Sequence, residues 1–126
     1  MDFDERMAKA LELIAEAEKL IYDGDYGEGV VLVQNAVESA VKALEGKYKA
    51  GVSGKDLMAK FARFTDDAEI LNSAKVIDDF FSTTLYPVGF DTGTEEYDIS
   101  QGKALLALKY GKYLINFVQS RISQED

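Results

Sequence analysis

Apolar residues recur at steps of three and four along most of the chain, which is the spacing that places them on one side of an α-helix. The pattern is interrupted by short polar or glycine-containing stretches such as "DGDYGEG" and "KAGVSGK". The only proline disfavours helical geometry in the residue before it and therefore ends the fourth periodic segment. The predicted helices cover residues 3–22, 30–48, about 55–64, Asp66 to just before Pro87, and about 100–122.

Capping signals precede four of these segments. A short polar residue followed three positions later by an acid can satisfy the first free N–H groups of a helix. The pairs with this spacing are Asp2 with Glu5, Asp25 with Glu28, Ser53 with Asp56, and Asp66 with Glu69. At 126 residues, 47% of them apolar, the chain can build one hydrophobic core. We therefore expect an all-α fold, an up-and-down bundle of four main helices plus one short helix, with residues 1–126 forming a single domain.

The last predicted helix has two apolar faces instead of one. The first comprises Ala104, Leu108, Gly111, Ile115, Val118 and Ile122, and the second comprises Ala107, Tyr110, Leu114 and Phe117. A small monomer rarely covers two such faces, so we expect a homodimer formed through this helix.

Two residue types are absent from the chain, and their absence excludes several kinds of chemistry. Without cysteine there is no disulfide, no thiol nucleophile and no cysteine-bound metal. Without histidine there is no imidazole to serve as a general base or a metal ligand. We expect no cofactor. We also expect no metal site, because the acidic segment 91–98 lacks the alternating ligands and central glycine of an EF-hand loop.

The charge of the chain also limits its partners. A net charge of −9 opposes binding to nucleic acid, because polyanions are bound by clusters of lysine and arginine. The acidic start differs from a secretory signal, and no apolar run approaches the ~20 residues of a membrane span. We therefore expect a cytoplasmic protein that binds neither membranes nor nucleic acid.

Several motifs, in order along the chain, resemble those of the HEPN family of small helical domains. The family's helix-two core "A-V-E-x-x-x-K-A" is matched by residues 36–43, its "D-L" pair by Asp56 and Leu57, and its "T-x-Y-P" helix end by residues 84–87. The resemblance covers nearly the whole chain and implies the same all-α fold. It also implies a partner, since such domains often accompany a minimal nucleotidyltransferase in pairs similar to toxin–antitoxin modules.

The chain departs from the family pattern at the residues that cleave RNA. RNA-cleaving members resemble one another in an arginine followed roughly four to six residues later by a histidine, and the two meet at a dimer cleft. Here Leu85 occupies the arginine position before Tyr86 and Pro87, Lys55 replaces the histidine of "H-D-L", and no histidine exists anywhere. The groups that would steady a phosphate and move protons are therefore missing, and we expect no catalytic residues.

The second predicted helix has a line of polar residues. Gln34, Glu38 and Lys42 lie four positions apart, with Asn35 beside them. One interpretation is a solvated edge with an ordinary Glu38–Lys42 ion pair contributing about 0.3 kcal/mol. The alternative is that this line faces a groove at the dimer axis and receives a nucleotide or a peptide. Asn35 and Glu38 are then the main candidates, because enclosed polar groups need partners.

Two further residues are candidate ligand contacts. Lys55 could contact a phosphate, although it also fits a solvated lysine in the first turn of a surface helix. Tyr86 could bind a ligand at the mouth of a cleft, or it could extend the aromatic cluster that Phe80 and Phe81 begin. Asp56 fits a cap partner of Ser53 at the start of the short helix.

Three functions stay open. The first is a non-catalytic, dimeric binding and assembly domain that engages a nucleotidyltransferase-type protein or a nucleotide. The second is an RNA-cleaving toxin with a non-standard active site such as Lys55, Glu38 and Tyr86. The third is a purely structural helical dimer with no ligand.

Overall fold

The computed structural model of the protein describes residues 3–48, 56–85 and 100–123. These ranges are helical throughout most of their length and contain no strand, so the all-α prediction is confirmed. The helices are α1 (Phe3–Tyr22), α2 (Tyr26–Tyr48), α3 (Leu57–Phe61), α4 (Ala68–Leu85) and α5 (Gln101–Ser123).

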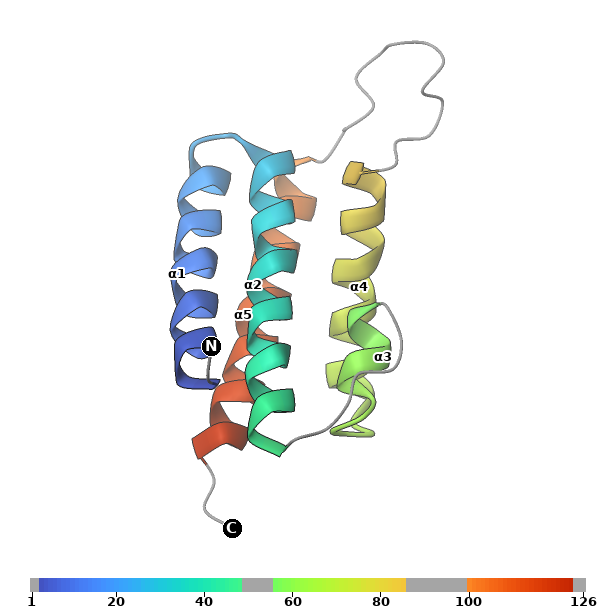
Figure 1. Ribbon diagram of the computed structural model, residues 1–126. Helices are drawn as coiled ribbons and strands as arrows, with labels where there is room; N and C mark the ends of the chain where they lie inside the picture. The colour runs from blue at the N-terminus through green and yellow to red at the C-terminus, as the bar shows by residue number, and fades with distance from the viewer. Residues whose placement is uncertain (1–2, 49–55, 86–99, 124–126) are drawn as a thin grey trace.

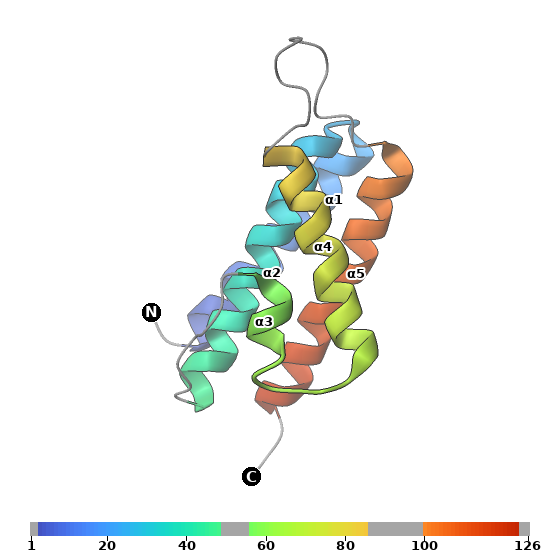
Figure 2. The same cartoon turned by 90° about the vertical axis from the view of Figure 1, so that its right-hand side faces the viewer.

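The four long helices run up and down beside one another, and the short α3 lies against α2 and α4 (Figure 1). Turning the molecule shows α4 and α5 side by side and running in opposite directions (Figure 2). α5 contacts α1, α2 and α4. The predicted bundle of four main helices and one short helix is therefore confirmed. None of the described helices combines the length and the apolar character that crossing a membrane requires.

Helix boundaries follow the capping chemistry, with small differences from the predicted positions. α1 has the predicted bounds, whereas α3 is half the predicted length. The N-cap of α3 is Asp56 itself, whose Oδ1 accepts a hydrogen bond from the Ala59 N–H at 2.8 Å. α4 is capped by Asp67 and not by Asp66, because the Asp67 Oδ1 accepts from the N–H of Glu69 at 2.8 Å. Ser53, the predicted cap of α3, lies outside the described residues.

A tight turn at Gly24 joins α1 to α2. Gly24 has a φ of 95°, in the region where a side chain would be strained. Its N–H donates to the Ile21 carbonyl at 3.1 Å, and the Asp25 N–H donates to the Leu20 carbonyl at 2.9 Å. These two bonds form a Schellman motif, which satisfies the last carbonyls of α1 and turns the chain directly into α2.

α1, α2 and α5 pack closely against one another at Gly111. A Cβ added to Gly111 would lie 2.6 Å from Val33 Cγ1 of α2 and 3.3 Å from Ile14 Cδ1 of α1. Such distances are too short for carbon atoms in van der Waals contact, so only glycine fits here without movement of its neighbours. The missing side chain thus allows α5 to lie in the angle between α1 and α2.

This position lets a single chain cover both apolar faces of α5. Ala104, Leu108, Gly111, Ile115 and Val118 of the first face are buried, and so are Ala107 and Leu114 of the second. Tyr110, Phe117 and Ile122 are partly buried against the same core. The reason given above for a dimer through these two faces is therefore wrong, because α5 has three helical neighbours in one bundle. A dimer formed through α5 would have to use a third face of this helix.

We predict that Gly111→Ala destabilises the protein by about 1–3 kcal/mol, since the new methyl group must displace Val33 and Ile14. Gly102→Ala in the same helix is the matched control. A Cβ at Gly102 would meet only Ser100 Oγ, at 3.9 Å, so that variant should be neutral or slightly stabilising. Chemical denaturation of the two variants measures the difference, and equal unfolding free energies would contradict the close approach at Gly111.

Candidate functional site

Glu38, a candidate binding residue of α2, forms an ion pair with α3. The Lys60 ammonium lies 2.6 Å from Glu38 Oε2, and only 11% of the Lys60 side chain is exposed. Glu38 is partly buried by the same contact. A charged hydrogen bond of this length in a largely enclosed place is stronger than a solvated pair on one helix. Glu38 therefore pairs with Lys60 and not with Lys42, the partner expected from helical spacing.

A second acid fixes the start of α3. The N–H groups of Leu57 and Met58 donate to the two carboxylate oxygens of Asp78 on α4, at 3.1 and 3.2 Å. Together with the bond from Ala59 to Asp56, they satisfy three N–H groups that the helix itself leaves free. Partial burial raises the pKa of Asp78, and the two backbone hydrogen bonds oppose that shift.

Apolar contacts complete the attachment of α3. Leu57 and Phe61 are fully buried, and the ring of Phe61 lies 5.9 Å from that of Phe117 on α5, centroid to centroid. α3 is thus held to α2 by an ion pair, to α4 by a carboxylate cap and to α5 by an aromatic contact. The acids in this region are occupied in holding the fold together.

The structure separates the polar residues predicted to form one line on α2. Gln34 is buried, with 6% of its surface exposed, whereas Asn35 and Lys42 are exposed. Within the described part of the chain, the Gln34 side-chain amide has no hydrogen-bond partner, a situation that costs about 1–3 kcal/mol for an enclosed polar group. Lys55 and Tyr86 lie outside the described residues, as does the acidic segment 91–98.

Several charged groups surround Glu45, two turns beyond Glu38 on α2. Partial burial raises the pKa of the Glu45 carboxyl, and the positive charges of Lys60, Lys42 and Arg6 lower it to a smaller extent. Lys60 therefore acts on two acids of α2, although its short ion pair is with Glu38. This cluster joins α1, α2 and α3 through electrostatic interactions.

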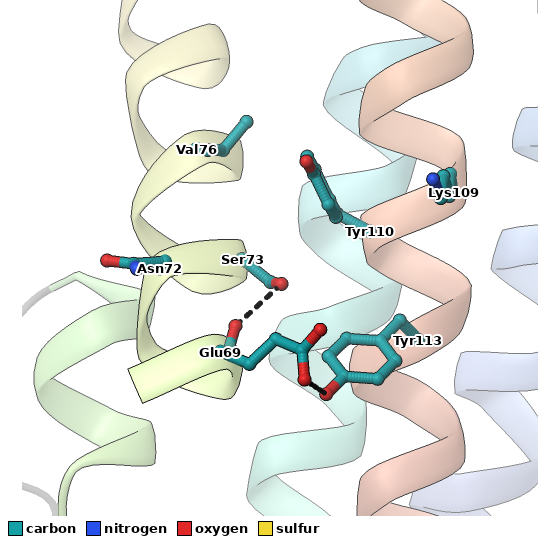
Figure 3. A pocket seen from close by; sticks show the side chains of 7 residues that line it. All are labelled: Glu69, Asn72, Ser73, Val76, Lys109, Tyr110 and Tyr113. Atoms are coloured by element: carbon teal, nitrogen blue, oxygen red, sulfur yellow. Dashed lines mark hydrogen bonds between the residues drawn. The ribbon is translucent and has the colours of Figure 1, made fainter. Parts of the chain in front are cut away.

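A groove of about 310 Å³ lies between α4 and α5. Its lining residues are Glu69, Asn72, Ser73 and Val76 from α4, and Lys109, Tyr110 and Tyr113 from α5. Glu69 extends across the groove, and its Oε1 accepts a hydrogen bond from the Tyr113 hydroxyl at 3.2 Å (Figure 3). Partial burial raises the pKa of the Tyr113 phenol, and the nearby Glu69 carboxylate raises it further, so the hydroxyl stays protonated and remains a donor.

A second groove, of about 500 Å³, lies on the opposite side of Lys109 and Tyr113. Tyr22 of α1 forms its far wall, and Leu105, Leu108, Lys112 and Asn116 of α5 form most of the rest. The outer face of α5 is therefore a ridge between two grooves. Leu106 and Tyr113 on this face are 40% and 36% exposed, which is high for apolar or aromatic side chains.

The acids beside α3 and in the groove between α4 and α5 have hydrogen-bond partners within the chain. Glu38 and Asp78 are hydrogen-bonded to structural partners, and Glu69 faces a tyrosine. No group of three or more acids in the described residues has the geometry to hold a metal ion.

The sequence pattern did not predict the contacts of Lys60 and Asp78 or the Glu69–Tyr113 hydrogen bond. A signal for Lys60 was present, because it directly precedes Phe61 and follows Leu57 by three positions, which places it on the buried side of α3. Asp78 follows the buried Ile77, so it too lies beside the apolar stripe of its helix. No local pattern pointed to the contact between Glu69 and Tyr113, which are 44 residues apart.

The protein is a small all-α domain in which a short helix is fixed beside four long ones. The chain belongs to the HEPN family: the family model described as the HEPN domain matches residues 3–121. No functionally curated protein matches the chain.

Solved structures show the same fold at low sequence identity. An archaeal HEPN homologue has a TM-score of 0.82 and 21% identity, over 98% of this chain and 99% of its own. A protein from Thermus thermophilus has a TM-score of 0.79 and 22% identity, over 95% and 98%. A HEPN domain protein from Thermotoga maritima has a TM-score of 0.76 and 18% identity, over 96% and 99%.

We predict that Glu38→Gln destabilises the protein by about 1–3 kcal/mol, because it removes the carboxylate that directly pairs with the enclosed Lys60 ammonium. Adding Lys60→Met should recover most of this loss. Lys75→Met, which removes an exposed pair with Asp79, is the control and should cost at most about 1 kcal/mol. Urea denaturation gives the three values, and a Glu38→Gln effect no larger than the control would show that the pair is solvated.

The raised pKa of Glu45 predicts a dependence of stability on pH. The folded protein holds this proton more tightly than the unfolded chain, so the contribution is complete at acidic pH and is lost as pH rises through the folded-state pKa. Glu45→Gln, which is neutral at every pH, should therefore gain stability relative to the wild type as pH rises from the ordinary pKa of a glutamate through the raised pKa of Glu45. Denaturation at a series of pH values measures the gain. A difference that stays constant, or favours the wild type as pH rises, would contradict the prediction.

Proposed function

We propose that this protein is a non-catalytic HEPN domain that acts as a dimeric binding and assembly module. The observation that carries the proposal is the absence of the catalytic pair. The chain has no histidine, and a leucine, Leu85, stands where RNA-cleaving members of the family have arginine. No imidazole can move a proton, and no guanidinium at that position can stabilise a phosphate in the transition state.

The engagement of Glu38 supports the same proposal. A carboxylate acting as a general base must reach the proton that it removes, whereas Glu38 already accepts a short bond from Lys60. If Glu38 acted as a general base, its bond to Lys60 would have to break, and the enclosed Lys60 ammonium would lose the carboxylate that pairs with it. The attachment of α3 to α2 accounts for the pairing of both residues without a catalytic role.

The partner we propose is a minimal nucleotidyltransferase-type protein, with a nucleotide as the alternative ligand, in a pair similar to a toxin–antitoxin module. Asn35 and Lys42 are exposed on α2 and are candidate contacts on that side of the bundle, with Lys55 and Tyr86 as further candidates from the sequence. Glu38 and Gln34 would take part only if binding rearranged their surroundings, since one is paired and the other is buried. Co-purification with a nucleotidyltransferase encoded beside this chain would support the pairing. Loss of that binding on Lys42→Glu would locate it on α2.

An RNA cleavage assay tests the non-catalytic assignment. Purified wild-type protein should leave single-stranded RNA intact, with and without added divalent metal, and Glu38→Ala should be indistinguishable from it. Cleavage by the wild type that Glu38→Ala abolishes would instead establish a ribonuclease with a non-standard site. A mock purification from cells without the gene controls for contaminating nucleases.

A further inference from the structure

The groove between α4 and α5 contains two opposite charges without ionic partners. Lys109 and Glu69 line it, and neither forms an ion pair with any other described residue. The polar contact of Glu69 is the hydrogen bond that it accepts from the neutral Tyr113 hydroxyl. Lys109 projects from the outer face of α5 beside Tyr110 (Figure 3). Both charges are therefore available to a molecule that docks here.

The two charges lie at different levels along the groove. Tyr113 marks the level of Glu69, because the two side chains are hydrogen-bonded at 3.2 Å. Lys109 precedes Tyr113 by four residues, which is about one helical turn or ~6 Å along the axis. A two-fold axis perpendicular to α5 and midway between these levels would bring each charge opposite its complement in a second copy. The groove is thus self-complementary.

The distribution of charge over the whole chain favours the same face. Two copies with a net charge of −9 each repel one another, and most surfaces would bring acids together. α5 is the exception, because its basic residues are Lys103, Lys109, Lys112 and Arg121 and it contains no acid. α4 contains Glu69, Asp78 and Asp79 and only one lysine. Seating α5 of one copy against α4 of the other therefore brings opposite charges together.

Shape and polarity are consistent with a helix as the occupant. The outer face of α5 forms a ridge, with Leu106 and Tyr113 as exposed apolar or aromatic groups, and the groove beside it is bounded by α4. Helices commonly associate by packing ridges of side chains on one helix into the grooves between side chains on its neighbour. With a two-fold axis, α5 of each copy would pack into the groove of the other copy, so the same contact would form twice.

We propose that the groove between α4 and α5 is the docking surface for a second copy of this chain, with Lys109 of each subunit paired with the partner subunit's Glu69. The inference rests on the proposed function, since it identifies the surface of the proposed dimer. The surface differs from the two apolar faces of α5 that the sequence had indicated, because those are covered within one chain.

Charge reversal tests the pairing. We expect the wild type to be a dimer in light scattering and sedimentation at micromolar concentration. Lys109→Glu and Glu69→Lys should each weaken association by about tenfold, because each places like charges at two symmetric positions. The double variant should return to within about threefold of the wild type. Circular dichroism and thermal unfolding identify any variant that fails to fold.

Matched controls come from an exposed ion pair on α1. Lys9 and Glu12 pair at 3.8 Å on a surface that lines neither groove, so Lys9→Glu and Glu12→Lys make the same changes in net charge elsewhere. They should leave the dissociation constant within about threefold of the wild type. Single reversals at 69 and 109 that act no more strongly than these controls, or a double variant that does not recover, would overturn the inference.

Cross-linking tests the geometry without depending on charge. Because the chain has no cysteine, Glu69→Cys and Lys109→Cys each give a protein with one thiol. When the two variants are mixed, a short bis-maleimide should link one to the other in higher yield than either to itself, since only residues 69 and 109 are opposite one another. Equal yields, or no linked product, would contradict the arrangement.

The outcomes separate this inference from the proposed function. A wild-type dimer that ignores the reversals and the mixed cross-link would reject this surface and leave the non-catalytic assembly domain standing. A monomer at about 100 μM would reject the dimer and this surface together. Cleavage of RNA by the wild type would reject the proposed function whatever the result for the interface.

Discussion

The close approach of α1, α2 and α5 at Gly111 determines how the other surfaces of the molecule are used. With a hydrogen in place of a side chain, α5 lies directly against Val33 and Ile14. It therefore buries its two apolar faces against three helices of its own chain. What remains outside is a third face with Leu106, Lys109 and Tyr113, bordered by grooves on both sides. A larger residue at position 111 would push α5 outward and alter both grooves.

A second constraint explains why the polar residues of α2 do not form an open binding site. α3 has only five residues, too few for a helix that is stable by itself, so its position depends on groups from its neighbours. Glu38 supplies the counterion for Lys60, Asp78 supplies acceptors for two N–H groups, and the aromatic contact with Phe117 fixes the other side. Acids that could serve chemistry are thereby committed to the fold. The chain also has neither the arginine nor the histidine of the RNA-cleaving members, which fits a structural role for these acids.

The sequence predicted the helices well because their signals are local. Periodic apolar residues and a cap within a few positions were enough to give the bounds of α1 and to place the others approximately. The partners of the polar residues could not be predicted in this way. Glu38 has Lys42 four positions away, yet it pairs with Lys60, 22 residues away, because α3 folds back against α2. The two faces of α5 were identified correctly, but their coverage depends on how many helices surround α5, which a pattern along one helix does not contain.

The proposed dimer requires that the outer face of α4 and α5 be the contact between two copies of the chain. A mixture of isotope-labelled and unlabelled protein tests this directly, since isotope-filtered NMR detects only contacts between a labelled and an unlabelled copy and no substitution is needed. Intermolecular NOEs should join residues 69–76 of α4 to residues 106–113 of α5, whereas residues 8–12 of α1 should give none. Intermolecular NOEs centred on α1 or on the exposed side of α2, or no intermolecular NOEs at millimolar concentration, would contradict it.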